Sequence, residues 1–167
     1  MIALYPGSFD PVTLGHVDMV RRVAGLAEQV IVAVLDNPHK TPLFSAGERM
    51  GLLRGALGDI PGVEVAAFSG LLAAYARQRQ VTAIIRGVRD GEDWAGEARY
   101  AWHNRLLDGG VETLLLPASP AFSHISSRIV REAAAHIYRL GLADGPLRQL
   151  VPPEVCAALM EKYITKG

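Results

Sequence analysis

Short apolar runs rich in β-branched residues alternate along the chain with segments whose apolar positions recur at helical spacing. Such runs, which have few polar interruptions, are typical of strands that are buried on both faces of a parallel sheet. They fall at residues 2–5, 30–35, 63–68, 81–85 and 113–116. Strands that alternate with helices in this way predict an α/β fold with a doubly wound, five-stranded parallel sheet.

The segments between and after these runs predict helices. One starts at a capping box, Ser45-Ala46-Gly47-Glu48, with Met50, Leu53 and Leu57 expected on its buried face. Further helices are predicted over residues 71–80, 92–107, 126–140 and 153–164. The pattern after residue 126 is helical throughout, so we expect a single domain over residues 1–167, a Rossmann-like sheet with C-terminal helices packed against it.

The composition is that of an ordinary globular protein. Half of the 167 residues are apolar, and 17 basic residues balance 17 acidic ones. We therefore expect no nucleic-acid or membrane partner, whereas a small anionic substrate stays compatible because local charge can differ from the total. The N-terminus lacks the features of a signal peptide, no run reaches the roughly 18 apolar residues of a membrane span, and a single cysteine, Cys156, fits a reducing compartment. These observations favour a cytoplasmic protein.

The loop after the first predicted strand carries the strongest functional signal. Ligands of open α/β sheets bind beyond the carboxyl ends of the strands, where a helix N-terminus offers free N–H groups to an anion. Gly7 lets the backbone approach a phosphate closely, and Ser8 adds a hydroxyl. His16 is predicted in the first turn of the following helix, where the helix dipole should lower its pKa and a neutral ring can still donate one hydrogen bond.

This loop resembles the nucleotidyltransferase α/β-phosphodiesterase superfamily, whose signature joins G-x-F-D-P to a following x-x-G-H. Gly7-Ser8-Phe9-Asp10-Pro11 and Thr13-Leu14-Gly15-His16 match it. Thr13 stands where many members have a first histidine, as in the phosphopantetheine adenylyltransferases. The resemblance implies that Ser8, Phe9 and His16 contact ATP, with Ser8 also contacting the second substrate.

Two further segments are similar to those that hold phosphopantetheine in that family. Taken alone, Lys40 is typical of a solvated loop residue, but Asn37-Pro38-His39-Lys40 resembles the family's N-P-x-K segment, whose lysine binds substrate phosphate. Leu72 follows Ser69-Gly70 and resembles a residue that lines the pantetheine arm, although an ordinary place in a helix core explains it equally well.

Two arginines follow the fourth predicted strand. Arg86-Gly87-Val88-Arg89 places them beside a buried strand, where an arginine needs an anion, a carboxylate or solvent. The segment resembles a family motif whose first basic residue binds the phosphopantetheine phosphate and whose Gly-x-Arg binds ATP. The resemblance gives the first role to Arg86 and the second to Gly87, Val88 and Arg89. Beyond them, Glu97 matches an ATP-side carboxylate, and Asn104 matches a polar position on the same helix.

A serine-rich segment precedes the helix predicted from residue 126. Serines at a helix start either cap it or bind phosphates with their hydroxyls and free N–H groups. The segment resembles the family's ATP-binding loop, although His124 and Arg128 depart from its pattern, and Arg128 partly matches mononucleotide adenylyltransferases. The ATP contacts that the resemblance implies here are Phe122, Ser123, His124, Ile125, Ser126, Ser127 and Arg128.

The implied reaction moves AMP from ATP to 4′-phosphopantetheine, giving dephospho-coenzyme A and pyrophosphate, the penultimate step of coenzyme A biosynthesis. A phosphate is already an anion at neutral pH, so direct in-line attack needs no protein nucleophile, and catalysis rests on position and charge. His16, Lys40 and Arg89 are the expected catalytic residues. Mg²⁺ is expected to arrive on the nucleotide phosphates, with no metal site built by the protein. The resemblance also implies a homohexamer.

Three alternatives stay open at this point. A sister transferase would adenylylate nicotinate mononucleotide or cytidylylate a phosphoalcohol; Thr13 and the Lys40 segment argue against it, and Arg128 argues weakly for it. A non-catalytic nucleotide sensor would not need the basic residues together with His16. A flavodoxin-like binding module finds no support in the first loop, and fold alone does not decide among these.

Overall fold

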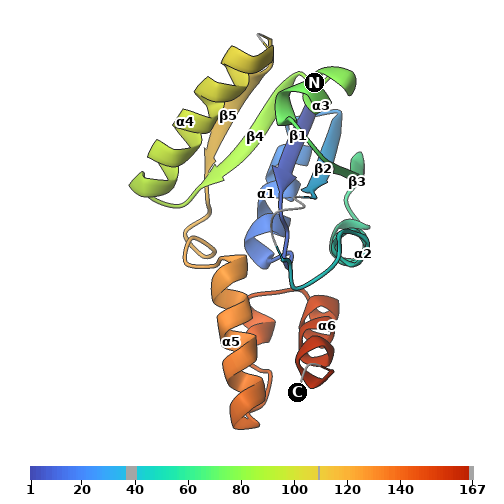
Figure 1. The fold of residues 1–167 in the computed structure, drawn as a ribbon, viewed down its shortest axis with the longest axis vertical. Coiled ribbons are helices and arrows are strands. Elements are labelled where there is room, and N and C mark those ends of the chain that lie inside the picture. Colours follow the sequence, from blue (N-terminus) through green and yellow to red (C-terminus); the bar gives the residue numbers. More distant parts are fainter. Residues whose placement is uncertain (37–40, 109, 166–167) are drawn as a thin grey trace.

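The computed structural model describes residues 1–36, 41–108 and 110–165. Its centre is a parallel sheet of five strands in the order β3-β2-β1-β4-β5 (Figure 1). The strands are β1 (Ile2–Gly7), β2 (Gln29–Leu35), β3 (Val63–Phe68), β4 (Ala83–Val88) and β5 (Glu112–Pro117). The predicted doubly wound α/β sheet is thus confirmed, with β1 in the middle between β2 and β4.

Helices connect the strands and continue beyond the last one. They are α1 (Leu14–Ala24), α2 (Ala46–Leu57), α3 (Leu72–Gln78), α4 (Gly91–Asp108), α5 (Ser127–Leu140), a short 3-10 helix η1 (Leu147–Gln149) and α6 (Pro153–Ile164). The helices α1, α2, α5 and α6 share one apolar core, whereas α3 packs on the other sheet face and contacts α4. Figure 1 shows α5 and α6 below the carboxyl ends of the strands.

The two faces of the sheet are apolar because successive strand residues alternate between them. Tyr5 and Val32 face the core that includes α1 and α2, whereas Leu4 and Ile31 face the α3 side. From β1 the chain passes through α1 to β2 on one side of the sheet centre, and β4 and β5 are added later on the other side of β1. The strand order therefore reverses between β1 and β4. Ligands of open α/β sheets bind at such a switch point, so a ligand site is expected at the carboxyl ends of these two strands.

Several element ends differ from the sequence prediction by one to three residues, as where β1 continues beyond residue 5 to Gly7. The strand predicted to end at residue 85 continues to Val88, because β4 keeps pairing with β5 through Arg86, Gly87 and Val88. On α2 the buried face contains Arg49 with Leu53 and Leu57, whereas Met50 is only half-buried. The helical spacing was correct, but its first position is a cation instead of a methionine.

Helix α4 is unusual because no side chain described on it is buried. It stands with β5 at one edge of the sheet in Figure 1. Large apolar side chains on this edge lie exposed, among them Trp94, Tyr100, Trp102, Leu106 and Leu107. Charged residues interrupt the helix, and within the described ranges no helix combines the length and apolarity that a membrane span requires.

Candidate active site

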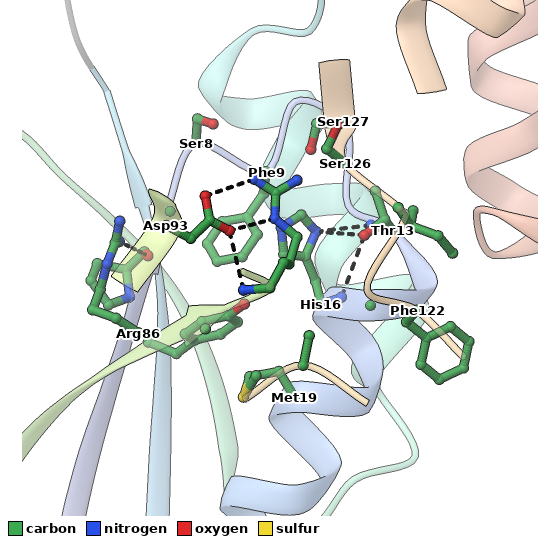
Figure 2. A pocket seen from close by; sticks show the side chains of 18 of the residues that line it. Ser8, Phe9, Thr13, His16, Met19, Arg86, Asp93, Phe122, Ser126 and Ser127 are labelled. Atoms are coloured by element: carbon green, nitrogen blue, oxygen red, sulfur yellow. Dashed lines mark hydrogen bonds and ion pairs between the residues drawn. The ribbon is translucent and has the colours of Figure 1, made fainter. Parts of the chain in front are cut away.

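Two adjoining cavities open at the carboxyl ends of β1 and β4. The first has a volume of about 280 Å³ and the second about 360 Å³. They share four lining residues, Pro6, Gly7, Ser8 and Arg86. Figure 2 shows the first cavity, with Ser8, Ser126 and Ser127 at its top and Met19 at its bottom. The shared wall means that two ligands bound side by side would meet at Ser8 and Arg86.

The loop after β1 is held by an aromatic ring. A Cβ at Gly7 would lie 2.9 Å from Cζ of Phe9, so only glycine fits under this ring without a shift. Phe9 is 2 % exposed, has a φ of 47° and packs edge-on against the ring of His16, with the ring centroids 5.0 Å apart. Phe9, predicted as an ATP contact, thus lines the first cavity and also contacts the His16 side chain.

The hydrogen bonds of His16 fix its tautomer. It occupies the third helical position of α1, and the backbone N–H of Thr13 donates to its Nδ1 over 3.0 Å. Nδ1 is therefore an unprotonated acceptor, and the ring proton of the neutral imidazole lies on Nε2. The Thr13 hydroxyl also lies 3.0 Å from this Nδ1, and it accepts from the His16 backbone N–H over 3.4 Å, which completes a capping box (Figure 2). His16 lines the cavity, so it can act there as a neutral N–H donor.

The charge state of His16 follows from its surroundings. Burial lowers its pKa from 6.5 to about 4, and the positive charges of Arg89 and Arg86 act in the same direction. The sequence predicted a lowered pKa from the helix dipole, but burial is the largest cause. Since the folded pKa lies below the unfolded value, protonation favours the unfolded chain. The stability that depends on the neutral ring is complete above pH 6.5 and is lost as the pH falls towards 4.

A nuclear magnetic resonance titration tests both properties of His16. In long-range proton–nitrogen spectra of the ring, we expect the neutral form protonated on Nε2 throughout the range from pH 7 down to about 5. A His16 ring that is already protonated on both nitrogens at pH 6, or that carries its single proton on Nδ1, would contradict the burial and the Thr13 contact seen in the structure.

The two arginines at the end of β4 are each held by a carboxylate of α4. Arg86 binds Glu97 through Nε and Nη2 at 2.6 and 2.7 Å and also donates to the Pro6 carbonyl. Burial works against its charge, but Glu97 outweighs this and raises the pKa of Arg86. Arg89 binds Asp93 in the same two-pronged way at 2.6 and 3.0 Å, which lowers the pKa of that carboxyl. Both guanidinium groups are thus charged and oriented at the cavity wall.

The start of α5 forms the opposite wall. Ser126 caps this helix through the N–H of Ile129, and the Ser127 hydroxyl donates to the Pro11 carbonyl over 2.8 Å. Figure 2 shows both serines at the cavity. The predicted ATP contacts that line the first cavity are Ser8, Phe9, His16, Gly87, Arg89, Glu97, Phe122, Ile125, Ser126 and Ser127.

Four other predicted ATP contacts do not line the first cavity: Val88, Ser123, His124 and Arg128. Val88 is buried in the sheet, and the Ser123 hydroxyl donates to the Pro120 carbonyl. Arg128 has an 82 % exposed side chain and pairs with Glu132 over 2.9 Å. Their contacts with a nucleotide stay a prediction.

The second cavity is lined by both apolar and polar side chains. Leu35, Phe68 and Leu72 supply apolar surface, and Asn104 and Arg86 supply hydrogen-bonding groups. The predicted substrate contacts Ser8, Leu72 and Arg86 therefore lie around one space. Lys40, the fourth of them and a predicted catalytic residue, lies outside the described residues.

The carboxylates of the first cavity are not free to hold a metal ion. Asp93 and Glu97 both line it, and each is occupied by two hydrogen bonds from an arginine. Within residues 1–36, 41–108 and 110–165 we find no cluster of three His, Cys, Asp or Glu side chains that could bind one. A divalent ion on ATP would have to take its ligands chiefly from the phosphates.

Comparison with known proteins shows the class to which this chain belongs. The family model described as cytidylyltransferase-like matches residues 4–133, which include Arg86, Arg89 and the start of α5. Among solved structures, a nicotinic acid mononucleotide adenylyltransferase from Plasmodium falciparum covers 99 % of this chain and 95 % of its own at a TM-score of 0.65 and 12 % identity. At that identity the likeness concerns the fold alone. Fold and family model together define a nucleotidyltransferase.

Closer relatives narrow the class further. Proteins named phosphopantetheine adenylyltransferase from Mannheimia succiniciproducens and Caldanaerobacter subterraneus are both 46 % identical to this chain. The first match covers 95 % of this chain and 96 % of the relative, and the second covers 97 % of each. A relative of the same name from Chloroflexus aggregans is 44 % identical over 99 % of both chains. The chain belongs to the phosphopantetheine adenylyltransferases.

Proposed function

We propose that this chain transfers the adenylyl group of ATP to 4′-phosphopantetheine and releases pyrophosphate and dephospho-coenzyme A. The observation that carries the proposal is the pair of cavities that meet at Ser8 and Arg86. ATP would occupy the first cavity, between the end of β4 and the start of α5. Phosphopantetheine would extend into the second, with its arm beside Leu72 and its phosphate at Arg86. The two reacting phosphates would then meet at the shared wall.

The reaction follows from charge and position. A phosphate oxygen of phosphopantetheine attacks the α-phosphorus of ATP, a new P–O bond forms, and the bond from that phosphorus to the bridging β-oxygen breaks. Pyrophosphate leaves with the electron pair, so the step needs no protein nucleophile. His16 donates from Nε2 and Arg89 donates from its guanidinium as negative charge shifts on the phosphates. Lys40 is proposed as a third donor from the sequence match.

We propose that Mg²⁺ enters with ATP as part of the substrate. This is supported by the occupied state of Asp93 and Glu97, which leaves the triphosphate oxygens as the natural ligands. The residues of the protein then orient the phosphates: Ser126 and Ser127 lie at the N-terminus of α5, where N–H groups favour an anion. A cytoplasmic location is part of the proposal and fits the single cysteine, Cys156.

The proposed function is tested by measuring pyrophosphate release from ATP and Mg²⁺ with 4′-phosphopantetheine, and in parallel with nicotinate mononucleotide. We expect release with phosphopantetheine alone, because the second cavity has an apolar wall for the pantetheine arm. Release with nicotinate mononucleotide alone would assign the sister activity. ATP binding without release in either mixture would favour a nucleotide sensor.

We also propose that the chain assembles with copies of itself as a homohexamer. The exposed large apolar side chains of α4 and β5 support self-association, since burial of such side chains against another copy removes apolar surface from water. Trp102 is 72 % exposed, Leu106 is 76 % exposed, and Leu114 on the edge strand β5 is 42 % exposed.

Substituting Trp102→Glu should break this assembly. A charge in the middle of an apolar contact is left without a partner when the contact forms, which destabilises it. Light scattering during size exclusion should report about six chains of 18.0 kDa for the unchanged protein and a smaller species for the variant. Leu26→Glu is the control, because Leu26 is 70 % exposed outside α4 and β5. A wild-type monomer, or a Trp102→Glu variant of unchanged mass, would contradict the proposal.

A further inference from the structure

Arg49 is a buried cation outside the residues discussed so far as ligands. It lies in the first turn of α2 and is 2 % exposed. Among the described residues, the buried polar and charged side chains are Arg49, Asp10 and Thr13. Thr13 holds His16, and Asp10 belongs to the first loop, so Arg49 is the one that comes from outside the β1–α1 connection.

The guanidinium of Arg49 bridges β1 and β2 where these strands separate. The two strands pair up to Gly7 and Val34. Nη1 of Arg49 then donates to the Ser8 carbonyl at 2.9 Å and to the Leu35 carbonyl at 3.1 Å, the residues that follow this last pair. Nη2 donates to the Asp36 carboxylate at 3.3 Å. One planar group thus fixes the distance between the loop of Ser8 and the end of β2.

This arrangement is not the one that stability alone would favour. Burying a cation is costly, and apolar residues of similar volume often replace buried ion pairs without loss. Nε of Arg49 is buried and finds no hydrogen-bond partner in the described part of the chain, which adds to the cost. The side chain of Asp36, its carboxylate partner, is 57 % exposed, so this ion pair offsets only part of the cost of burying Arg49. What Arg49 provides is a fixed distance between two carbonyl groups, those of Ser8 and Leu35.

The two residues whose carbonyls Arg49 binds are part of the cavity lining. Ser8 lines both cavities, and Leu35 lines the second. The segment between β2 and α2 is tied to the same loop at its other end, where the Asp10 carboxylate accepts from the N–H groups of Leu43 and Phe44 at 2.8 and 2.9 Å. Arg49 and Asp10 therefore connect the first loop to residues 35–36 at the end of β2 and to residues 43–44 before α2.

We infer that Arg49 is a positioning residue that sets Ser8 and the end of β2 at the spacing required by the phosphate of the acceptor substrate. The inference rests on the proposed function, because it concerns how that acceptor is placed for attack. Displacing a reacting group by about 1 Å can cost 10²-fold in rate. The ATP contacts at Arg89, Ser126 and Ser127 lie on other elements and should not change.

The test compares Arg49→Lys with the unchanged protein. Lysine keeps the charge but carries a single donor nitrogen on a flexible stem, whereas Arg49 reaches the two carbonyls with Nη1 and the Asp36 carboxylate with Nη2. We expect kcat/KM for phosphopantetheine to fall by about 10- to 100-fold, with the KM for phosphopantetheine raised. The dissociation constant of ATP, measured without acceptor, should change much less than the KM for phosphopantetheine, because Ser8 is one of many predicted ATP contacts. Arg54→Lys, an exposed position on the same helix, is the matched control and should leave all three constants unaltered.

A second variant gives an independent readout. In Arg49→Ala, added methylguanidinium should restore part of the lost turnover, because it can occupy the vacated position and donate to both carbonyls. A fully folded Arg49→Lys with unchanged constants, or one whose ATP affinity falls as much as its acceptor KM rises, would overturn the inference. An Arg49→Lys protein that fails to fold would assign Arg49 to stability and overturn it as well. Inactivity of the unchanged protein would instead reject the proposed function.

Discussion

Replacing His16 by alanine should lower kcat by about 10²- to 10³-fold, the cost of losing one donor that stabilises developing charge. The ring is neutral because its pKa is lowered to about 4, and its Nδ1 already accepts a hydrogen bond from the Thr13 N–H. Only Nε2–H is then available to the phosphates. Since the donor acts as charge shifts in the transition state, the loss should fall on kcat and not on the KM for ATP.

The control for this measurement is His136→Ala, an exposed histidine on α5. Its kinetics should match those of the unchanged protein. Steady-state pyrophosphate release with both substrates varied separates the two constants. A His16→Ala protein with nearly unchanged kcat and a raised KM for ATP would reduce the residue to a binding contact.

Replacing Asp10 by alanine should lower the free energy of unfolding by about 3 kcal/mol, because one buried and one part-buried N–H donor lose their acceptor and an unsatisfied buried group costs about 1–3 kcal/mol. The donors belong to Leu43 and Phe44, and Asp10 is 7 % exposed. Arg131 also donates to the Asp10 carbonyl and lies 3.6 Å from its carboxylate, so a cation loses its counter-charge. In a chain of 167 residues the melting temperature should fall by roughly 6–12 °C.

Asp59→Ala is the matched control for Asp10→Ala. Asp59 pairs with Arg21 over 3.0 Å at the surface, with side chains 68 % and 57 % exposed. Its loss should change stability by less than about 1 kcal/mol, as expected for an exposed ion pair. Urea unfolding of both variants decides the comparison. Equal stability of the two would mean that the Asp10 contacts with the β2–α2 segment contribute nothing measurable.

The fold was predictable because its signals are local. Apolar runs located all five strands, and the turn and cap residues located the helices. The end of β4 was missed because Arg86 and Gly87 are poor strand residues, and only pairing with β5 keeps them in the sheet. Residue type gave the wrong answer there because the tertiary hydrogen bonds dominate.

Part of the cavity lining could be predicted from the sequence, but the contacts between those residues could not. The sequence brought Ser8, His16, Arg86 and Arg89 together, and the structure places all of them at the cavities. It did not reveal that Thr13 sets the tautomer of His16, although position and spacing within a capping box contained that signal.

The role of Arg49 was also missed from sequence, because a charged residue beside a capping box is expected at the surface. The signal that could have found it is the four-residue spacing from Leu53 and Leu57, which extends the buried face of α2 back to position 49. Its carbonyl partners, Ser8 and Leu35, lie 41 and 14 residues away along the chain and are brought to it only by the sheet.

The central claim is that the adenylyl group passes directly from ATP to phosphopantetheine in these two cavities. The most direct test is a single turnover with enzyme in excess over ATP labelled at the α-phosphate, quenched and separated into protein and small molecules. The account predicts that the label moves from ATP into dephospho-coenzyme A at the rate of pyrophosphate release, and that the protein stays unlabelled throughout. Label held on the protein before it reaches the product, or no label in dephospho-coenzyme A at all, would contradict it.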